Sequence, residues 1–475
     1  MLLYIIFAQG LVRPILAYSV FQPNCTAPLE STNFVRATNV RGTLDILWTS
    51  LFTLITCCWT VQHLNIPRKP KRPTWPEGPN SVWLKCVTHV YELMKFYILG
   101  VWPKIKWTLV TLVLPEFLVG KAVHERHLAK RYVPRFRKLA DSLDEDFRWM
   151  GKHWTITHSF YANMGGFVVR TQSNRELHDI PLNCKALLQV LHKMYQRPRR
   201  TRIFKIPRIT EEEINDKSKS DLLIKVITIG QLVWFFTQVV VRGLRGLVIS
   251  QLEIAVLAYA ACTICVFFLC LSKPQDVQVP TMLPAGSSPF REPIVHAIDK
   301  HRRNRLLGSN KLVSWFGATR PFAAVSDIME GKGINPGPLP NDAVIPYIYV
   351  EDNVRIGNLV FNWIDIGCFV AGIIFGGIHC AAWTSHFPTP TERVVWQIAC
   401  VCIVGLLPIL IPVKWADRNV ESRKIHHVMS FLEVLICLGY FLARLYLIVE
   451  IFRTLCFQPP SAFIATWTSE MPHIS

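Results

Sequence analysis

The stretch "LLIKVITIGQLVWFFTQVVVRGLRGLVISQLEIAVLAYAACTICVFFLCL", residues Leu222 to Leu271, decides the class of fold. It holds two apolar runs, Leu222–Val241 and Leu247–Leu271, and each is close to the ~20 residues that a helix needs to cross a bilayer. About five residues around Gly243 and Gly246 separate the runs. The stretch therefore predicts a hairpin of two membrane-spanning helices over residues 222–271.

Four further apolar runs of similar length occur along the chain, namely Leu44–Gln62, Leu359–Trp383, Val394–Val413 and Val428–Ile451. Of the 475 residues, 51% are hydrophobic, and the formal net charge is +19. Such basicity is also found in nucleic-acid-binding proteins, but soluble helices that are apolar all round rarely reach these lengths. We predict an all-α membrane protein with about six transmembrane helices, at 44–62, 222–271 and within 357–451.

The distribution of Lys and Arg predicts the orientation of these helices. Residues 63–221, 272–356 and the loop 414–427 carry 43 of them, whereas the connections on the other side carry 6. Since cytosolic loops are enriched in Lys and Arg, the first group is expected in the cytosol, and residues 20–43 and 452–475 in the lumen or outside the cell. The charge needs no nucleic-acid partner, and the expected partner is the bilayer of the endoplasmic reticulum or the plasma membrane. The sequence does not determine an oligomeric state.

The amino-terminal end carries signals for secretion and glycosylation. Residues 1–19 have the length and the small-residue ending of a cleaved signal peptide, although no basic residue precedes the apolar run, so an uncleaved anchor is the alternative. Asn24 begins an Asn-Cys-Thr glycosylation sequon on the expected lumenal side. Cys25 and Cys456 also fall on that side, where a disulfide between them is permitted.

The expected cytosolic region 63–221 is predicted to be largely helical. Within it, residues 107–120 are apolar but contain Pro115 and Glu116, and they are too short to span, so we predict an interfacial or re-entrant segment. Thr210 and Glu213 have capping-box spacing at the start of a helix that we expect to continue into the second span.

A single histidine in "WTITHSFYANMGGF", Trp154–Phe167, is the first candidate site residue. In a short helix ended by the two glycines, Trp154, His158 and Tyr161 would share one face, which we expect to dock at the cytosolic membrane surface. Histidines among aromatic residues are more often packed and hydrogen-bonded than catalytic. The functional alternative is a cytosol-facing pocket in which His158 handles a proton beside Tyr161.

Charged residues inside apolar spans are the other candidates, because burying a charge in a membrane is costly and is usually functional or paired. Asp365 and His379 fall on roughly one face of a single predicted span, and so do Glu433 and Arg444 of another. They either join helices or line a polar chamber. Gly372 and Gly376 in the same region predict close helix packing. The histidine spacings match no metal-binding set, and no nucleotide-binding motif is present, so neither a metal nor a cofactor is expected.

Several segments resemble an uncharacterised family of multi-pass integral membrane proteins of filamentous and mushroom-forming fungi. The segments that carry the resemblance are "WTVQHLNIP" (Trp59–Pro67), "FYANMGGF" (Phe160–Phe167), "ITEEEINDKSKSD" (Ile209–Asp221), "RLYLIVE" (Arg444–Glu450) and "WTSEMPHIS" (Trp467–Ser475). The resemblance implies a fungal membrane protein and no particular reaction. The occurrence of some relatives near natural-product genes hints at lipid-like substrates and secondary metabolism.

Two functions of different classes remain open. The absence of a catalytic signature favours a non-enzymatic channel, transporter, sensor or scaffold, in which the intramembrane charges gate or pair. The alternative is a membrane-embedded enzyme or accessory protein that acts on an apolar lipid or natural product. Its site would combine His158 and Tyr161 with Asp365, His379 or Glu433, and its partner would be an apolar small molecule.

Overall fold

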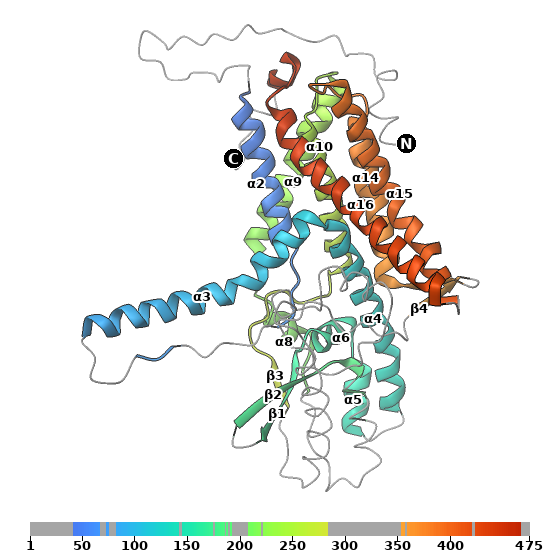
Figure 1. The fold of residues 1–475 in the computed structure, drawn as a ribbon. Helices are drawn as coiled ribbons and strands as arrows, with labels where there is room; N and C mark the ends of the chain where they lie inside the picture. The colour runs from blue at the N-terminus through green and yellow to red at the C-terminus, as the bar shows by residue number, and fades with distance from the viewer. Residues whose placement is uncertain are drawn as a thin grey trace.

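The computed structural model describes residues 41–66, 73–75, 82–141, 145–173, 176–185, 187–188, 191, 208–219, 222–283, 353–356, 359–419 and 423–466. Within these ranges, long helices form a bundle, and a smaller unit of short helices and strands lies beyond one end of it (Figure 1). Helix α4 (Pro115–Asp141) runs from the bundle into the smaller unit.

Six helices of the described ranges are long and apolar enough to cross a bilayer, as the sequence predicts. Many large apolar side chains of this bundle face outward, which suits contact with lipid rather than water. The six helices are α2 (Thr43–Thr60), α9 (Leu222–Leu244), α10 (Gln251–Leu269), α14 (Trp363–His379, extended to Ala382 by the short helix η3), α15 (Pro390–Asn419) and α16 (Arg423–Leu455).

The predicted hairpin of α9 and α10 is present. Local chemistry defines both ends of the turn between the two helices. Gly246 adopts φ +65°, a conformation that glycine takes at little cost, and it turns the chain after α9. Ser250 caps α10, since its hydroxyl accepts from the Glu253 amide while the Glu253 carboxylate accepts from the Ser250 amide. The turn is therefore short and fully hydrogen-bonded at the start of α10.

Residues 107–120, predicted to be interfacial or re-entrant, form a sharp corner between two helices. Helix α3 (Val82–Val113) ends two residues before Pro115, and α4 departs at an angle of 113°. A proline lacks the amide proton that would continue the helix, and it disfavours helical conformation in the residue before it. Trp107, Thr111 and Leu118 are all buried, so the corner enters the bundle.

Two glycines allow α4 to pass close to α14. A Cβ atom on Gly120 would lie 2.7 Å from the carbonyl oxygen of Ile364, and one on Gly367 would lie 2.6 Å from the Gly120 Cα. Elsewhere on α14, Gly372 and Gly376 pack against Leu407 and Val404 of α15, which confirms the predicted small-residue packing.

Helix α4 contributes to two separate hydrophobic cores. Its first turns, including Leu118 and Ala122, belong to the core of the bundle. Its later turns, including Tyr132 and Phe136, belong to the core of the smaller unit. That unit also contains α5 (Glu145–His153), α6 (Ile156–Asn163), α8 (Glu211–Asp216), β1 (Phe167–Ser173), β2 (Glu176–Leu182) and β3 (Thr281–Leu283).

The smaller unit differs from the predicted helical region in two respects. First, β1 pairs antiparallel with β2 and parallel with β3, in the order β2-β1-β3, so a small sheet follows the glycine turn at Gly165. Second, the capping box of Thr210 and Glu213 is present, but α8 ends at Asp216 and does not continue into α9. A second antiparallel pair, β4 (Asn353–Ile356) and β5 (Leu359–Asn362), directly precedes α14.

Candidate functional site

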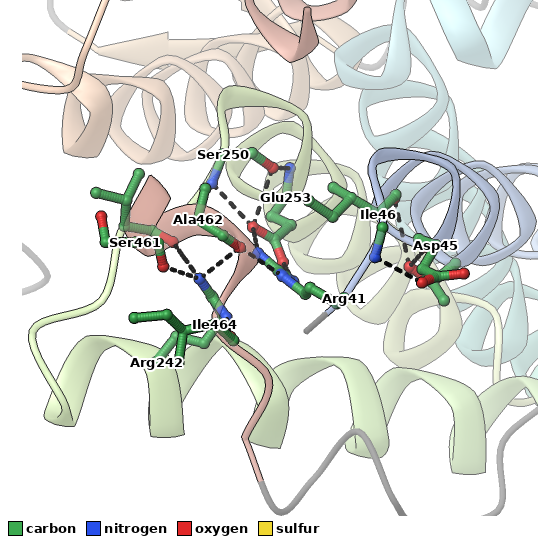
Figure 2. Close-up of polar contacts among 12 residues, drawn as sticks. Arg41, Asp45, Ile46, Arg242, Ser250, Glu253, Ser461, Ala462 and Ile464 are labelled. Carbon is green, nitrogen blue, oxygen red and sulfur yellow. Dashed lines mark hydrogen bonds and ion pairs between the residues drawn. The ribbon is translucent and has the colours of Figure 1, made fainter. Parts of the chain in front are cut away.

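Three buried clusters that contain charged side chains stand out in the described part of the chain, and the first joins the start of α2 to the segment after α16. Arg41, just before α2, donates to both carboxylate oxygens of Glu253 at 2.7 and 3.3 Å, and to the carbonyl of Ala462 at 2.7 Å (Figure 2). Arg242 donates at 2.8–3.1 Å to four carbonyls, those of Val248, Ser461, Ala462 and Ile464.

Every charged atom of this first cluster has a partner. Glu253 also accepts from the amide and the hydroxyl of Ser250. Buried charges that are both paired and hydrogen-bonded are stable in a low-dielectric interior, but they offer no position for a ligand. The cluster therefore holds the start of α2, the α9–α10 turn and the segment around η4 (Pro460–Phe463) together, and it is structural.

The second cluster surrounds the α3–α4 corner and is the candidate functional site. The break at Leu114 leaves backbone carbonyls of the last turn of α3 without partners from the helix, and such groups must find other donors when they are buried. The Tyr259 hydroxyl of α10 donates to the carbonyl of Leu112. Arg444 of α16 donates from Nε to the carbonyl of Val113 at 3.1 Å.

Glu116, in the first turn of α4, faces the same arginine. Its Oε1 lies 3.7 Å from Nη1 of Arg444, and each residue is 2% exposed. No hydrogen bond of ordinary geometry reaches either carboxylate oxygen of Glu116 or the hydroxyl of Tyr440, although that hydroxyl lies beside the carboxylate, close enough to interact with it. The Tyr440 side chain is within electrostatic range of both charged groups. This pair is thus buried like the first cluster but is incompletely hydrogen-bonded.

Aromatic rings enclose the other side of the arginine. The guanidinium carbon of Arg444 lies 3.9 Å from the centroid of the Phe375 ring, a cation–π contact. The ring of His379 stacks on the Phe375 ring, with the two centroids 4.4 Å apart. Its Nδ1 donates to the Phe375 carbonyl at 2.8 Å. Arg444 is therefore held by a carbonyl and an aromatic face independently of Glu116.

The third cluster lies where the bundle meets the smaller unit. Glu125 of α4 pairs with Lys121 at 3.2 Å and with Lys273 at 2.8 Å, and Lys273 also donates to the carbonyl of His63 at 2.7 Å. Burial, reinforced by the charge of Lys273, lowers the pKa of His63 to about 3. These groups tie α4 to the segments that follow α2 and α10. The two close ion pairs indicate a structural role, although Oε1 of Glu125 meets Lys121 without a hydrogen bond of ordinary geometry.

His158 and Tyr161 lie in the core of the smaller unit, separate from the spans. His158 is 3% exposed: its Nε2 donates to the Ile209 carbonyl at 3.0 Å, and its Nδ1 accepts from the Thr155 amide at 3.2 Å. Tyr161 hydrogen-bonds to Thr281. The predicted short helix and glycine turn are present, with φ +90° at Gly165.

The expected placement of the aromatic tips at the membrane surface was wrong. The indole of Trp154 stacks on Phe136 with ring centroids 3.8 Å apart, and it donates to Ser159. Burial lowers the pKa of His158 below its usual value. A histidine that is neutral and hydrogen-bonded at both nitrogens matches the structural interpretation given to such residues.

The candidates within the spans are separated along the bundle. Arg444 and His379 both border Phe375. Asp365 lies in the first turn of α14, far along that helix from His379, and Glu433 is buried about three turns before Arg444 in α16. The single enzyme site that would combine His158 with these residues is not assembled among the described residues, because they occupy two different cores.

Glu116 is the site residue that the sequence reasoning missed. A carboxylate directly after a proline inside an apolar run was a signal, but it was assigned to an interfacial or re-entrant segment and not considered as a site residue. Asn24 and Cys25 lie outside the described residues, and Cys456 is exposed after α16, so glycosylation and the disulfide stay predictions. In the described ranges, no group of three or more His, Cys, Asp or Glu side chains is arranged to hold a metal ion.

Comparison with known proteins gives a family but no activity. A family model described as "Family of unknown function (DUF8562)" matches residues 15–294, which is more than half of the chain. No curated protein and no solved structure matches the chain.

Proposed function

Since the chain belongs to the DUF8562 family, whose function is unknown, we propose a function from its geometry: a channel or transporter that carries protons or small monovalent cations. Six apolar helices fit a multi-pass membrane protein. Within that class, the observation that carries the proposal is the buried pair of Glu116 and Arg444 at the apex of the α3–α4 corner.

A corner of this kind supports transport more than a scaffold role. Non-helical backbone deep in a membrane protein is tolerated where it is covered by protein or lines a cavity, and broken helices often supply ion-binding groups. Here the break exposes carbonyls of α3 and directs the amino-terminal end of α4, with Glu116, into the bundle. A purely structural contact would be expected to resemble the fully satisfied cluster at Glu253.

The geometry also supports a particular role for each charge. Arg444 has two partners besides Glu116, the Val113 carbonyl and the Phe375 ring, so it can remain in place when Glu116 is protonated or binds a cation. The carboxylate of Glu116, by contrast, has no hydrogen bond of ordinary geometry, and only the Tyr440 hydroxyl lies beside it as a second polar neighbour. We assign the proton or cation to Glu116 and the resting counter-ion to Arg444.

The test is flux through the purified protein in liposomes. Proton entry is followed with a trapped pH-sensitive dye. The amounts of Na⁺ and of K⁺ taken up by the vesicles are measured separately. Wild type should give flux above that of empty vesicles, and Glu116→Gln should abolish it. Glu392→Gln, which removes the carboxylate of the more exposed Arg453 pair, should leave flux unchanged. Folded wild-type protein that carries none of the three ions would contradict the proposal.

The enzyme or accessory role on an apolar lipid or natural product then becomes the better hypothesis. It requires that a strain lacking the protein accumulate a lipid or metabolite precursor, which untargeted profiling would detect. A strain with an unchanged profile but altered tolerance of acid or salt would agree with transport. Locating a tagged copy of the chain in the same strain would show whether the protein resides in the endoplasmic reticulum or in the plasma membrane.

A further inference from the structure

Helix α3 projects sideways from the bundle, across the direction of the long helices, at the level between the bundle and the smaller unit (Figure 1). Apolar side chains recur at intervals of three and four residues along it, so they share one face of the helix. They are all exposed, and they are Trp83, Val87, Val90, Met94, Tyr97 and Val101.

The opposite face of α3 is polar and carries a positive excess. Lys85, Thr88, Glu92 and Lys95 follow the same three- and four-residue spacing, and Lys106 lies three turns beyond Lys95. Glu92 is paired with Lys95 at 3.5 Å. A helix with one wide apolar face that includes Trp and Tyr, and with lysines on the other face, has the composition of helices that lie in a membrane surface.

The carboxy-terminal part of α3, around Lys104, lies level with the ends of the spans. The ammonium group of Lys104 is 2.8 Å from a carboxylate oxygen of Asp276, which follows α10, and 5.0 Å from the centroid of the Trp59 ring, in the last turn of α2. Pro103, one residue earlier, interrupts the hydrogen bonds of α3 at this point. The segment Val82–Pro103 therefore adjoins the ends of two spans at its Pro103 end, and its Val82 end points away from the bundle.

From these observations we infer that Val82–Pro103 of α3 lies in the plane of the membrane that the bundle spans, on the side of the smaller unit. Its apolar face is immersed in the acyl-chain boundary, and Lys85 and Lys95 contact anionic lipid headgroups. An exposed apolar face of this length is not expected to remain in water. The inference does not depend on the transport function.

The experiment is a spin-label scan of α3 in the full-length protein in nanodiscs. The background carries Cys86→Ser and Cys456→Ser, which remove the two exposed cysteines of the described residues. Single cysteines then replace residues 83–101. An in-plane helix predicts that accessibility to oxygen relative to a water-soluble nickel complex rises and falls with the ~3.6-residue period of a helix, with maxima on the Trp83–Met94–Val101 face.

Three other results would overturn the inference. A steady change of accessibility from one end to the other would mean that α3 crosses the bilayer. High accessibility to the nickel complex at every position would mean that α3 is in water. Distance-dependent broadening between labels on the apolar face would mean that a second copy of the chain covers it.

The lipid preference has its own variants. Replacing Lys85 and Lys95 by Gln should reduce the depth of a label at position 94 in bilayers that contain an anionic lipid, and should not change it in purely zwitterionic bilayers. Met94→Glu should move labels at positions 87 and 101 toward water in both bilayers, whereas the matched control Thr88→Glu on the polar face should not. Equal depths in all these samples would contradict the assignment of the two faces.

Discussion

Among single residues, the buried carboxylates of Glu253 and Glu116 differ in how well they are hydrogen-bonded. Glu253 and Glu116 are both 2% exposed carboxylates beside an arginine. Glu253 accepts four hydrogen bonds, two of them from Arg41, whereas no hydrogen bond of ordinary geometry reaches Glu116, whose polar neighbours are Arg444 and the Tyr440 hydroxyl. Because an unsatisfied buried charge lowers stability, its presence is better explained by a role in function than by a role in folding.

The first prediction concerns the structural arginine. Arg41→Ala leaves the buried carboxylate of Glu253 without its counter-ion, and we expect a loss of about 3–5 kcal/mol in the free energy of unfolding. Lys95→Ala, which breaks an exposed pair, should change it by less than about 1 kcal/mol. Denaturation of the detergent-solubilised protein, followed by intrinsic tryptophan fluorescence, measures both. Equal effects would show that the cluster at Glu253 is not important for stability.

The second prediction is a dependence of stability on pH through His158. Its native pKa is lowered by burial, so in the range between that pKa and the unfolded value near 6.5 the unfolded chain binds more protons than the native one. The stabilisation is therefore present above about pH 6.5 and is lost as the pH falls. His158→Gln should make acid unfolding less steep while leaving any transport activity intact. A loss of activity at normal abundance would instead support a proton-handling role.

At the scale of the elements, the α3–α4 corner and its crossing with α14 determine where Glu116 lies. Pro115 ends α3, and the absence of side chains at Gly120 and Gly367 lets α4 approach α14. Two helices reach the corner directly, α10 through Tyr259 and α16 through Arg444, and Phe375 of α14 packs on the Arg444 guanidinium. The position of the carboxylate thus depends on helix packing more than on its own helix.

Glycine substitutions in α14 test this dependence. Gly367→Ala would place a Cβ 2.6 Å from the Gly120 Cα, and we expect a destabilisation of about 1–3 kcal/mol with loss of flux, because the backbone must move. Gly377→Ala in the same helix meets nothing within 4 Å, and it should be neutral or stabilise by up to about 1 kcal/mol. Thermal unfolding and the liposome assay are the measurements. The crossing is not critical if the two variants behave alike.

For the whole molecule, the two ends of the bundle sequence meet at one end of the structure. Arg41, before α2, and Ala462, after α16, are hydrogen-bonded to each other, and the smaller unit lies at the opposite end of the bundle (Figure 1). This arrangement supports the proposed topology, in which residues 20–43 and 452–475 share the lumenal side and 63–221 is cytosolic.

The fourth prediction tests that topology directly. In sealed microsomes, endoglycosidase treatment should shift the mobility of the wild-type chain but not that of Asn24→Gln. An impermeant maleimide should label a cysteine introduced at Lys152, an exposed residue of α5, from the cytosolic side without permeabilisation. Cys456 should react only after permeabilisation, and after reduction if it is paired with Cys25. Labelling of position 152 only after permeabilisation would reverse the orientation.

The sequence alone determined the class of fold, the number of spans and several local helix starts and turns. Long apolar runs extend over a single helix, and the capping box at Thr210 and the glycine turns at Gly165 and Gly246 act over a few residues, so all of them are visible in the sequence without a distant partner. Only the tertiary structure decided which charges face one another. The partner of Arg444 is Glu116, more than three hundred residues away, and pairing at that separation depends on how helices pack, which periodicity within one helix does not contain.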